Sequence, residues 1–203
     1  MTAKQMERFV RHCDKYFGQK NDRVIHPVAV DALHVDILLY DPTEKHPYWK
    51  MVTMGAGDYQ MPPAKNTIAR RNEYLMLVDK DVNMNDKETA FWYCQKLWTV
   101  SCYSYANKTH VTYGHSFEWQ NDDESDEMIA AFLEFPQMFD YGMLHCKSRL
   151  FRDTACLLVV LLNKDDLDRL MKIGPQQFSY YLFPDEENAP AHFLSERHRS
   201  EKF

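Results

Sequence analysis

Apolar residues recur at three- and four-residue spacing in the opening segment, which is the period of one face of a helix. The segment begins Thr2-x-x-Gln5, the pattern of a capping box, in which two side chains satisfy free amide groups at a helix start. The apolar positions that follow are Met6, Phe9, Val10, Cys13 and Phe17. The chain is therefore predicted to open with an amphipathic helix of about four turns.

Three segments of the first half have the β-branched and aromatic composition typical of strands, and they cover residues 35–40, 48–54 and 73–79. The connector between the first two holds two prolines, which cannot continue either strand. Residues 55–71 contain two glycines and two prolines with little periodicity. They form a predicted loop that exceeds about 12 to 15 residues, a length typical of functional loops.

The middle of the chain combines a predicted aromatic helix with a predicted half-buried strand. Asp86 can cap the helix, whose apolar face is expected to carry Phe91, Cys94, Trp98, Cys102 and Tyr105. Residues 110–119 alternate between apolar and polar, which is the period of a strand. The apolar side of that strand is expected to hold Val111, Tyr113, His115 and Phe117.

Two apolar runs follow, at residues 128–135 and 155–162. The second lacks alternation, which indicates a central strand covered on both faces. Asn163 and Asp166 are predicted to cap the next helix, which should stop at the Gly-Pro pair 174–175. A last short helix is expected to hold Phe178, Tyr181 and Leu182.

These elements predict one α/β (α+β) domain over residues 1–183, with a central mixed, largely antiparallel sheet and helices packed against it. Short connections between consecutive strands favour antiparallel pairing. Residues 184–203 are predicted to form a polar, loosely held tail.

The amino-acid composition argues against several classes of function. The chain of 203 residues has 24 Lys and Arg against 30 Asp and Glu, so its net charge of -6 disfavours a nucleic-acid partner. It contains only 6 glycines, and the pair Gly55-Ala56-Gly57 lacks the third glycine of a dinucleotide fingerprint. No Walker loop, G-x-S-x-G turn or H-E-x-x-H helix is present, so we expect neither a cofactor nor a catalytic site.

The 5 cysteines form no C-x-x-C pair and are odd in number, which favours reduced, mostly buried thiols over zinc ribbons or disulfides. No apolar stretch approaches the roughly 20 residues that span a bilayer. These features predict a cytoplasmic protein with no membrane partner. Its oligomeric state is left open.

Histidines leave one alternative open, a small hydrolase or metal enzyme. His34 and Asp36 should share a strand face, but the sequence places no nucleophile or third ligand in register with them, which favours a structural pair. His110 and Ser116 should share a face of another strand, which leaves a nucleophile with a histidine base open. Cys102, His115 and His145 could together bind a metal, although no two of them have the sequence spacing typical of metal ligands.

Aromatic residues point instead to a binding surface. The chain has 12 Tyr, 12 Phe and 4 Trp, and Tyr and Trp are enriched where proteins meet. We expect an exposed cluster at Tyr103, Tyr105 and Tyr113, and the acidic excess favours a basic partner. The acidic run at residues 122–127 is predicted to be a solvated turn.

Several short motifs resemble, in order and spacing, the Suppressor of fused (SUFU) domain family. They are Val35-Asp36-Ile37-Leu38, Pro42, Pro47-Tyr48, Val52-Thr53-x-Gly55, Asp58-x-x-Met61, Asn72-Glu73-x-Leu75, Trp98 to Tyr103, His110 to His115 and Leu157 to Asp168. The resemblance covers residues 30–182. The chain departs from the family's usual pattern at Asn72, at Ala56-Gly57, at Thr109 and in the acidic run.

The resemblance implies a non-enzymatic protein-binding domain of the single-domain bacterial type, many members of which look like immunity proteins that neutralise toxins. It also implies that Tyr103, His110 and Val111 match a peptide-holding region, and Asp58 and Tyr113 complete the predicted partner-binding set. A scaffold or regulatory binder of another protein is the remaining alternative.

Overall fold

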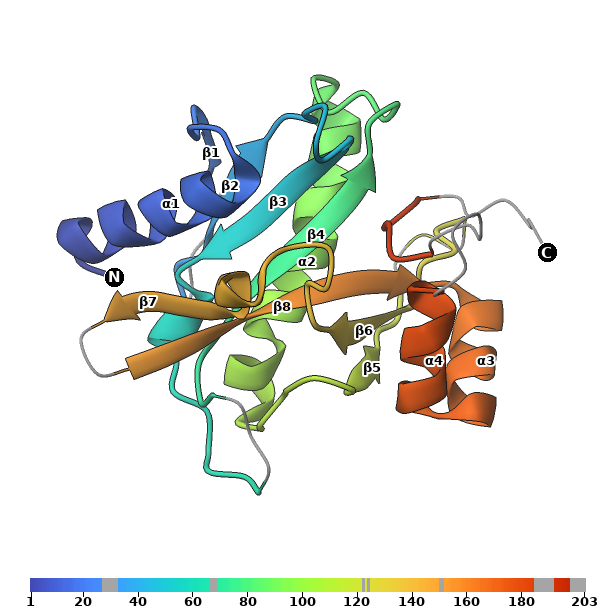
Figure 1. Cartoon of the computed structure of the whole chain (residues 1–203). Helices are drawn as coiled ribbons and strands as arrows, with labels where there is room; N and C mark the ends of the chain where they lie inside the picture. The colour runs from blue at the N-terminus through green and yellow to red at the C-terminus, as the bar shows by residue number, and fades with distance from the viewer. Residues whose placement is uncertain are drawn as a thin grey trace.

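The computed structural model describes residues 1–26, 33–65, 69–121, 123, 125–149, 152–184 and 192–197. Within these residues the chain forms an eight-stranded sheet, and seven of its strands follow the order β1-β2-β3-β4-β8-β6-β5, with β7 pairing separately with β8 (Figure 1). The strands are β1 (Arg23–Ile25), β2 (Asp36–Tyr40), β3 (Tyr48–Met54), β4 (Asn72–Asp79), β5 (Ser116–Glu118), β6 (Ala130–Glu134), β7 (His145–Arg149) and β8 (Arg152–Leu162).

Pairing in the sheet is mixed and largely antiparallel, which confirms the predicted fold class. The β4–β8 pair is parallel. The neighbouring pairs that extend from it on both sides are antiparallel. The apolar run at residues 155–162, which does not alternate with polar residues, predicted a central strand. In the structure β8 is central, and its residues from Thr154 to Leu162 are buried.

Helices cover both faces of the sheet: α1 (Ala3–Phe17), α2 (Lys87–Asn107), α3 (Lys164–Ile173) and α4 (Pro175–Leu182). Figure 1 shows α2 on one face and α1 with the α3–α4 pair on the other. Successive side chains of a strand point to opposite faces. Accordingly, Ile37 and Leu39 of β2 pack in the α2 layer, whereas Leu38 and Tyr40 pack in the opposite layer.

The helix starts follow the predicted capping chemistry. Thr2 and Gln5 form the capping box of α1. The Asn163 side chain accepts a hydrogen bond of 2.9 Å from the Asp166 amide, so Asn163 is the N-cap of α3 and Asp166 lies inside the helix. Each contact satisfies an amide that the helix itself leaves free.

Two predictions about the middle of the chain are wrong in part. Only Ser116–Glu118 of the predicted strand 110–119 is a strand, because the chain turns at Gly114, where φ is 80° and the His115 amide bonds to the Thr112 carbonyl. The buried face of α2 is also rotated from the predicted one: the two share Cys94, while Trp98 and Cys102 are half-buried and pack at the edge of the same core. Phe91 is 47% exposed, and the residues that face the core are Trp92, Tyr93, Cys94, Lys96, Leu97, Val100, Ser101 and Ser104.

Two strands escaped prediction, β1 and β7, because three- and five-residue segments carry too little periodicity. The tail is also not loose throughout. Ser195 is fully buried and bridges two strands: its amide donates to the Leu77 carbonyl at 2.8 Å, and its Oγ lies between the Leu161 amide and the Val159 carbonyl. The domain boundary at residue 183 stays a prediction.

Candidate functional site

One face of α2 lies toward β5 and the segment that follows β5. Trp92, Lys96, Thr99 and Tyr103 are four or three residues apart, so they line up on that face. Tyr103 stacks on Phe117 of β5, with ring centroids 4.3 Å apart and planes at 14°. A hollow lies further along this face, between α2 and the segment of residues 119–126 that follows β5, and we term it the α2–β5 cleft.

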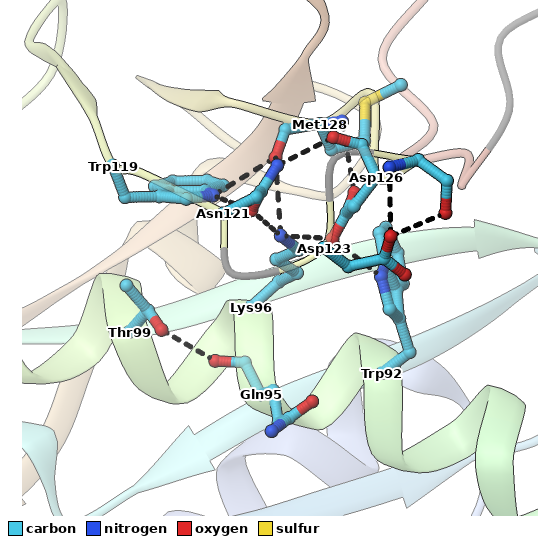
Figure 2. A network of polar contacts seen from close by, with 10 residues as sticks. Trp92, Gln95, Lys96, Thr99, Trp119, Asn121, Asp123, Asp126 and Met128 are labelled. Atoms are coloured by element: carbon cyan, nitrogen blue, oxygen red, sulfur yellow. Dashed lines mark hydrogen bonds and ion pairs between the residues drawn. The ribbon is translucent and has the colours of Figure 1, made fainter.

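The α2–β5 cleft has a volume of about 380 Å³ and a largely polar lining: Trp92, Gln95, Lys96, Thr99, Trp119, Gln120, Asn121, Asp123 and Asp126. Lys96 lies at its centre (Figure 2). The Lys96 ammonium pairs with Asp126 at 2.6 Å, and donates to Asn121 Oδ1 at 2.7 Å and to the Met128 carbonyl at 3.3 Å. These partners fix a charged side chain that is only 8% exposed.

Two tryptophans flank this ammonium, which lies 5.3 Å from the Trp92 ring and 5.2 Å from the Trp119 ring. Cations at this distance from a ring are attracted by its negative face. The indole of Trp92 donates to Asp126 at 3.0 Å, and that of Trp119 donates to Asn121 Oδ1 at 3.0 Å (Figure 2). The cleft is therefore preformed, with both rings held by hydrogen bonds.

The prediction of a solvated acidic turn is wrong for Asp126, which is half-buried and anchors this network. Asp123 fits the prediction, because it is exposed and accepts from Ser125, and these hydrogen bonds lower its pKa. Asp122 and Glu124 lie outside the described residues. The sequence signal for this contact was Lys96 among the large apolar residues Trp92, Tyr93 and Leu97, because a largely buried ammonium group needs polar or charged partners.

The edge of the sheet beside the cleft is open. In β5 and its flanks, the His115 carbonyl and the Trp119 amide bond to β6, so the backbone groups of Ser116 and Glu118 point away from β6. Within the described part of the chain no strand pairs with that side of β5. Unpaired amide and carbonyl groups at an edge can accept an added strand.

His110 and Val111 contact the predicted 55–71 loop. The Val111 amide donates to Met61 Sδ at 3.4 Å, and His110 Nδ1 lies 3.2 Å from the Pro62 carbonyl oxygen. Val111 is 3% exposed, and its carbonyl accepts from Asn72 at 2.9 Å. Val111 therefore holds the loop in place, while the half-buried His110 lies at its rim.

The other two predicted partner-binding residues, Tyr113 and the loop residue Asp58, make different contacts. Tyr113 stacks on Phe135 at 4.1 Å with planes at 6°, toward the far end of β6. Asp58 pairs with the N-terminal ammonium of Met1. The structure thus packs Tyr103 against Phe117 of β5, outside the lining of the α2–β5 cleft, and brings His110 and Val111 to the loop. Tyr113 and Asp58 make separate contacts.

The loop itself is anchored by Glu73, which is 1% exposed. Its carboxylate accepts from the Thr53 hydroxyl at 2.7 Å and from the amides of Gly55, Ala56 and Gly57 at 3.0, 3.2 and 3.0 Å. Burial raises the pKa of Glu73 to about 7, although these hydrogen bonds act in the opposite direction. The start of the loop is therefore built around one buried carboxyl group.

The groups suggested for catalysis do not assemble as predicted. Among the described residues Cys102, His115 and His145 form no metal-ligand group. His145 lies 3.1 Å from the Tyr141 hydroxyl, and burial raises the pKa of the Cys102 thiol, which disfavours the reactive thiolate. The described residues also show no hydrogen bond between His110 and Ser116.

The interpretation of His34 and Asp36 as a pair without a third group is wrong. His26, which follows β1, reaches the same carboxylate, and the three side chains form a compact cluster. No sequence pattern indicated this contact, because the β1–β2 pairing that creates it was not predicted.

The order of strands and the two helical layers define an α+β domain with one mixed sheet. The family model of the Suppressor of fused protein (SUFU) matches residues 31–193. The chain belongs to this family, which confirms the resemblance noted in the sequence. No curated protein matches the sequence.

Solved structures share the fold at low sequence identity. The SUFU homologue from Neisseria gonorrhoeae FA 1090 is 10% identical with a TM-score of 0.67, over 98% of this chain and 97% of that chain. A chain of the Sufu–Fu complex is 12% identical with a TM-score of 0.64, over 97% and 91% of the two chains. Drosophila Suppressor of Fused is 13% identical with a TM-score of 0.66, and this chain covers 51% of it. None of the described helices has the length and apolar character that crossing a bilayer requires.

Proposed function

We propose that this chain is a non-enzymatic protein-binding domain that holds an extended segment of its partner along β5 and beside the α2–β5 cleft. The observation that carries the proposal is the open β5 edge next to a preformed, tryptophan-lined cleft. Strand addition supplies main-chain hydrogen bonds, and adjacent hollows select side chains. Membership of a family with a solved Sufu–Fu complex supports a binding role.

The chemistry of the region favours a basic partner. Glu118 of β5 and Asp123 at the cleft rim are both exposed, and the whole chain carries a net charge of -6. Complementary charge accelerates encounter, and the effect weakens with salt. In this proposal Tyr103 and His110 border the bound segment, Val111 supports the 55–71 loop, and Tyr113 and Asp58 are further contact residues.

We further propose that the partner is a toxin domain, and that the chain acts in the cytoplasm as an immunity protein that covers the toxin's active or substrate-binding surface. The support is the resemblance to single-domain bacterial members of the family. A scaffold that binds its partner without inhibiting it is the competing proposal, and the assay below separates the two.

The experiment measures binding to the protein encoded beside this chain's gene, by calorimetry and in a growth-rescue assay. Glu118→Pro removes an outward amide from β5, and Glu118→Ala keeps it, so only the proline variant should weaken binding by more than about tenfold. Tyr103→Ala and His110→Ala should also weaken binding while circular dichroism stays unchanged.

Equal affinities for the wild-type and Glu118→Pro proteins would remove β5 from the binding site. Unchanged binding in Tyr103→Ala and His110→Ala would move the site elsewhere. Tight binding without rescue of growth would support a scaffold and reject the immunity role.

A further inference from the structure

The pairing of β1 with β2 brings two histidines to one buried carboxylate. In the antiparallel register Ile25 lies opposite Ile37, so the next residue, His26, lies opposite Asp36. His34 precedes Asp36 by two positions, which puts both side chains on the same side of extended chain. The backbone itself therefore presents three potential metal ligands together.

The side chains converge on a single oxygen atom. His26 Nδ1 lies 2.7 Å and His34 Nε2 lies 2.8 Å from Asp36 Oδ1, and the ligating atoms all lie within 4.8 Å of one another. The Asp36 side chain is 3% exposed, whereas those of His26 and His34 are 66% and 56% exposed. The carboxylate thus forms the buried side of the cluster, and the two imidazoles form its solvent-exposed side.

We propose that His26, His34 and Asp36 form a binding site for a divalent transition-metal ion of the zinc class, with water or a partner's side chain in the fourth position. Two imidazole nitrogens and one carboxylate oxygen suit zinc, whereas magnesium and calcium prefer sites made only of oxygen. Three protein ligands with an open fourth position are a recurrent zinc arrangement.

Binding of the ion requires the two imidazole rings to move. Zinc bonds of about 2.0 to 2.1 Å in a tetrahedron put neighbouring ligand atoms roughly 3.3 Å apart. The imidazoles must therefore withdraw from Asp36 Oδ1 by about half an ångström, and their two ligating nitrogens, up to 4.8 Å apart, must approach each other by up to about 1.5 Å. The two rings can make these movements because more than half of each side chain is exposed. The inward nitrogens now donate to Asp36 Oδ1, so metal binding requires each ring to give up the proton on its inward nitrogen, either to its outer nitrogen or to solvent.

The test titrates the chelator-stripped full chain with Zn²⁺ in competition with a chromogenic chelator. We expect one equivalent to bind and the melting temperature to rise, because the ion binds the folded chain preferentially. Co²⁺ serves as a second probe, since a four-coordinate Co²⁺ ion with nitrogen and oxygen ligands absorbs strongly in the visible range.

His26→Ala and His34→Ala should each lower the Zn²⁺ affinity by at least about tenfold, because even loss of an outer-shell partner has effects of that size. Both residues are exposed, so these variants should fold. His115→Ala is the matched control, since it removes an exposed histidine outside the cluster, and it should leave the affinity unchanged.

Absence of stoichiometric Zn²⁺ binding would leave the cluster as hydrogen bonds alone and overturn the proposal. So would equal affinities in the wild type, His26→Ala and His34→Ala. The readout is metal binding itself, so the result does not depend on the partner-binding proposal.

Discussion

Glu73 determines the position of the 55–71 loop from inside the domain. Three consecutive loop amides and the Thr53 hydroxyl all donate to its carboxylate. An amide side chain cannot replace it fully, because one end of Gln donates where every neighbour is also a donor. The surroundings thus select a carboxyl group, although burial opposes its charged form.

Glu73→Gln is expected to destabilise the fold by about 1 to 3 kcal/mol, the usual effect of leaving buried polar groups unpaired. The folded-state pKa of Glu73, about 7, lies above its ordinary value of 4.5, so the folded chain holds a proton that the unfolded chain releases between these values. The stability that this proton contributes is fully present below pH 4.5 and is lost as the pH rises to about 7.

Urea unfolding at pH 5 and pH 7.5 checks this prediction. The difference in unfolding free energy between wild type and Glu73→Gln should be larger at pH 5, since groups common to both proteins cancel. Glu118→Gln, at an exposed position, is the control and should change neither value. A difference that grows with pH would contradict the prediction.

Lys96 and Asp126 are coupled through direct contact, which predicts non-additive effects. Lys96→Met should destabilise the chain by about 3 kcal/mol, because it leaves the Asp126 charge with fewer partners in a site that is about 10% exposed. Asp126→Asn should have a similar effect.

The double variant should be less destabilised than the sum of the single variants by about 1 to 3 kcal/mol, as residues in one network usually are. Urea unfolding of the four proteins at one pH measures this coupling energy. Additive effects would show that the ion pair contributes nothing beyond its separate contacts.

At the scale of elements, the turn after β3 depends on a glycine. Gly55 has φ of 128°, and a Cβ atom there would lie 2.2 Å from the His34 carbonyl oxygen. Gly18, the C-cap of α1, also has positive φ, at 71°, but a Cβ there would meet no atom within 4 Å. A substitution at Gly18 therefore tests backbone strain alone, whereas a substitution at Gly55 tests backbone strain together with a steric clash.

Gly18→Ala should destabilise the chain by about 1 to 2 kcal/mol, the strain of a left-handed alanine. Gly55→Ala should destabilise it by more than about 3 kcal/mol, because a backbone atom has to move as well. Chemical denaturation of both variants makes the comparison. Equal losses would show that the β3 turn moves freely away from the residue 34 carbonyl.

At the scale of the whole molecule, the two layers share one sheet. All four tryptophans, Trp49, Trp92, Trp98 and Trp119, pack in the α2 layer, whereas α1, α3 and α4 pack on the opposite face. Strand β8 has side chains in both layers, and it pairs with β4, β6 and β7. Unfolding of either layer would expose the apolar side chains on one face of this central strand, so we expect the two layers to unfold together.

Unfolding followed by tryptophan fluorescence and by far-ultraviolet circular dichroism should give coincident transitions. Leu170→Ala, in the layer that holds no tryptophan, should shift both midpoints equally and destabilise by about 2 to 5 kcal/mol. Midpoints that separate in this variant would mean that the two layers unfold independently.

Much of the fold followed from local patterns. The spacing of apolar residues predicted α1, and the unalternated run predicted the central position of β8, because a strand covered on both faces has no polar side. The family resemblance was also contained in short motifs of the sequence, and the family model confirms it.

Alternation failed at residues 110–119 because Val111 and Phe117 are buried by different neighbours on either side of a turn at Gly114. The apolar and polar residues therefore alternate as in one continuous strand, although the chain turns between them. The aromatic face of α2 was misplaced for a related reason: with aromatic residues on several sides, the helix pattern does not fix which side meets the sheet.

The sequence by itself determined the fold class, the caps and the family, because each depends on neighbours in the chain. Tertiary structure alone decided the Lys96–Asp126 network, whose members are 30 positions apart, and the approach of His26 to Asp36. Both depend on which strands pair and in which register. That choice is made by packing across the whole sheet, which no local pattern encodes.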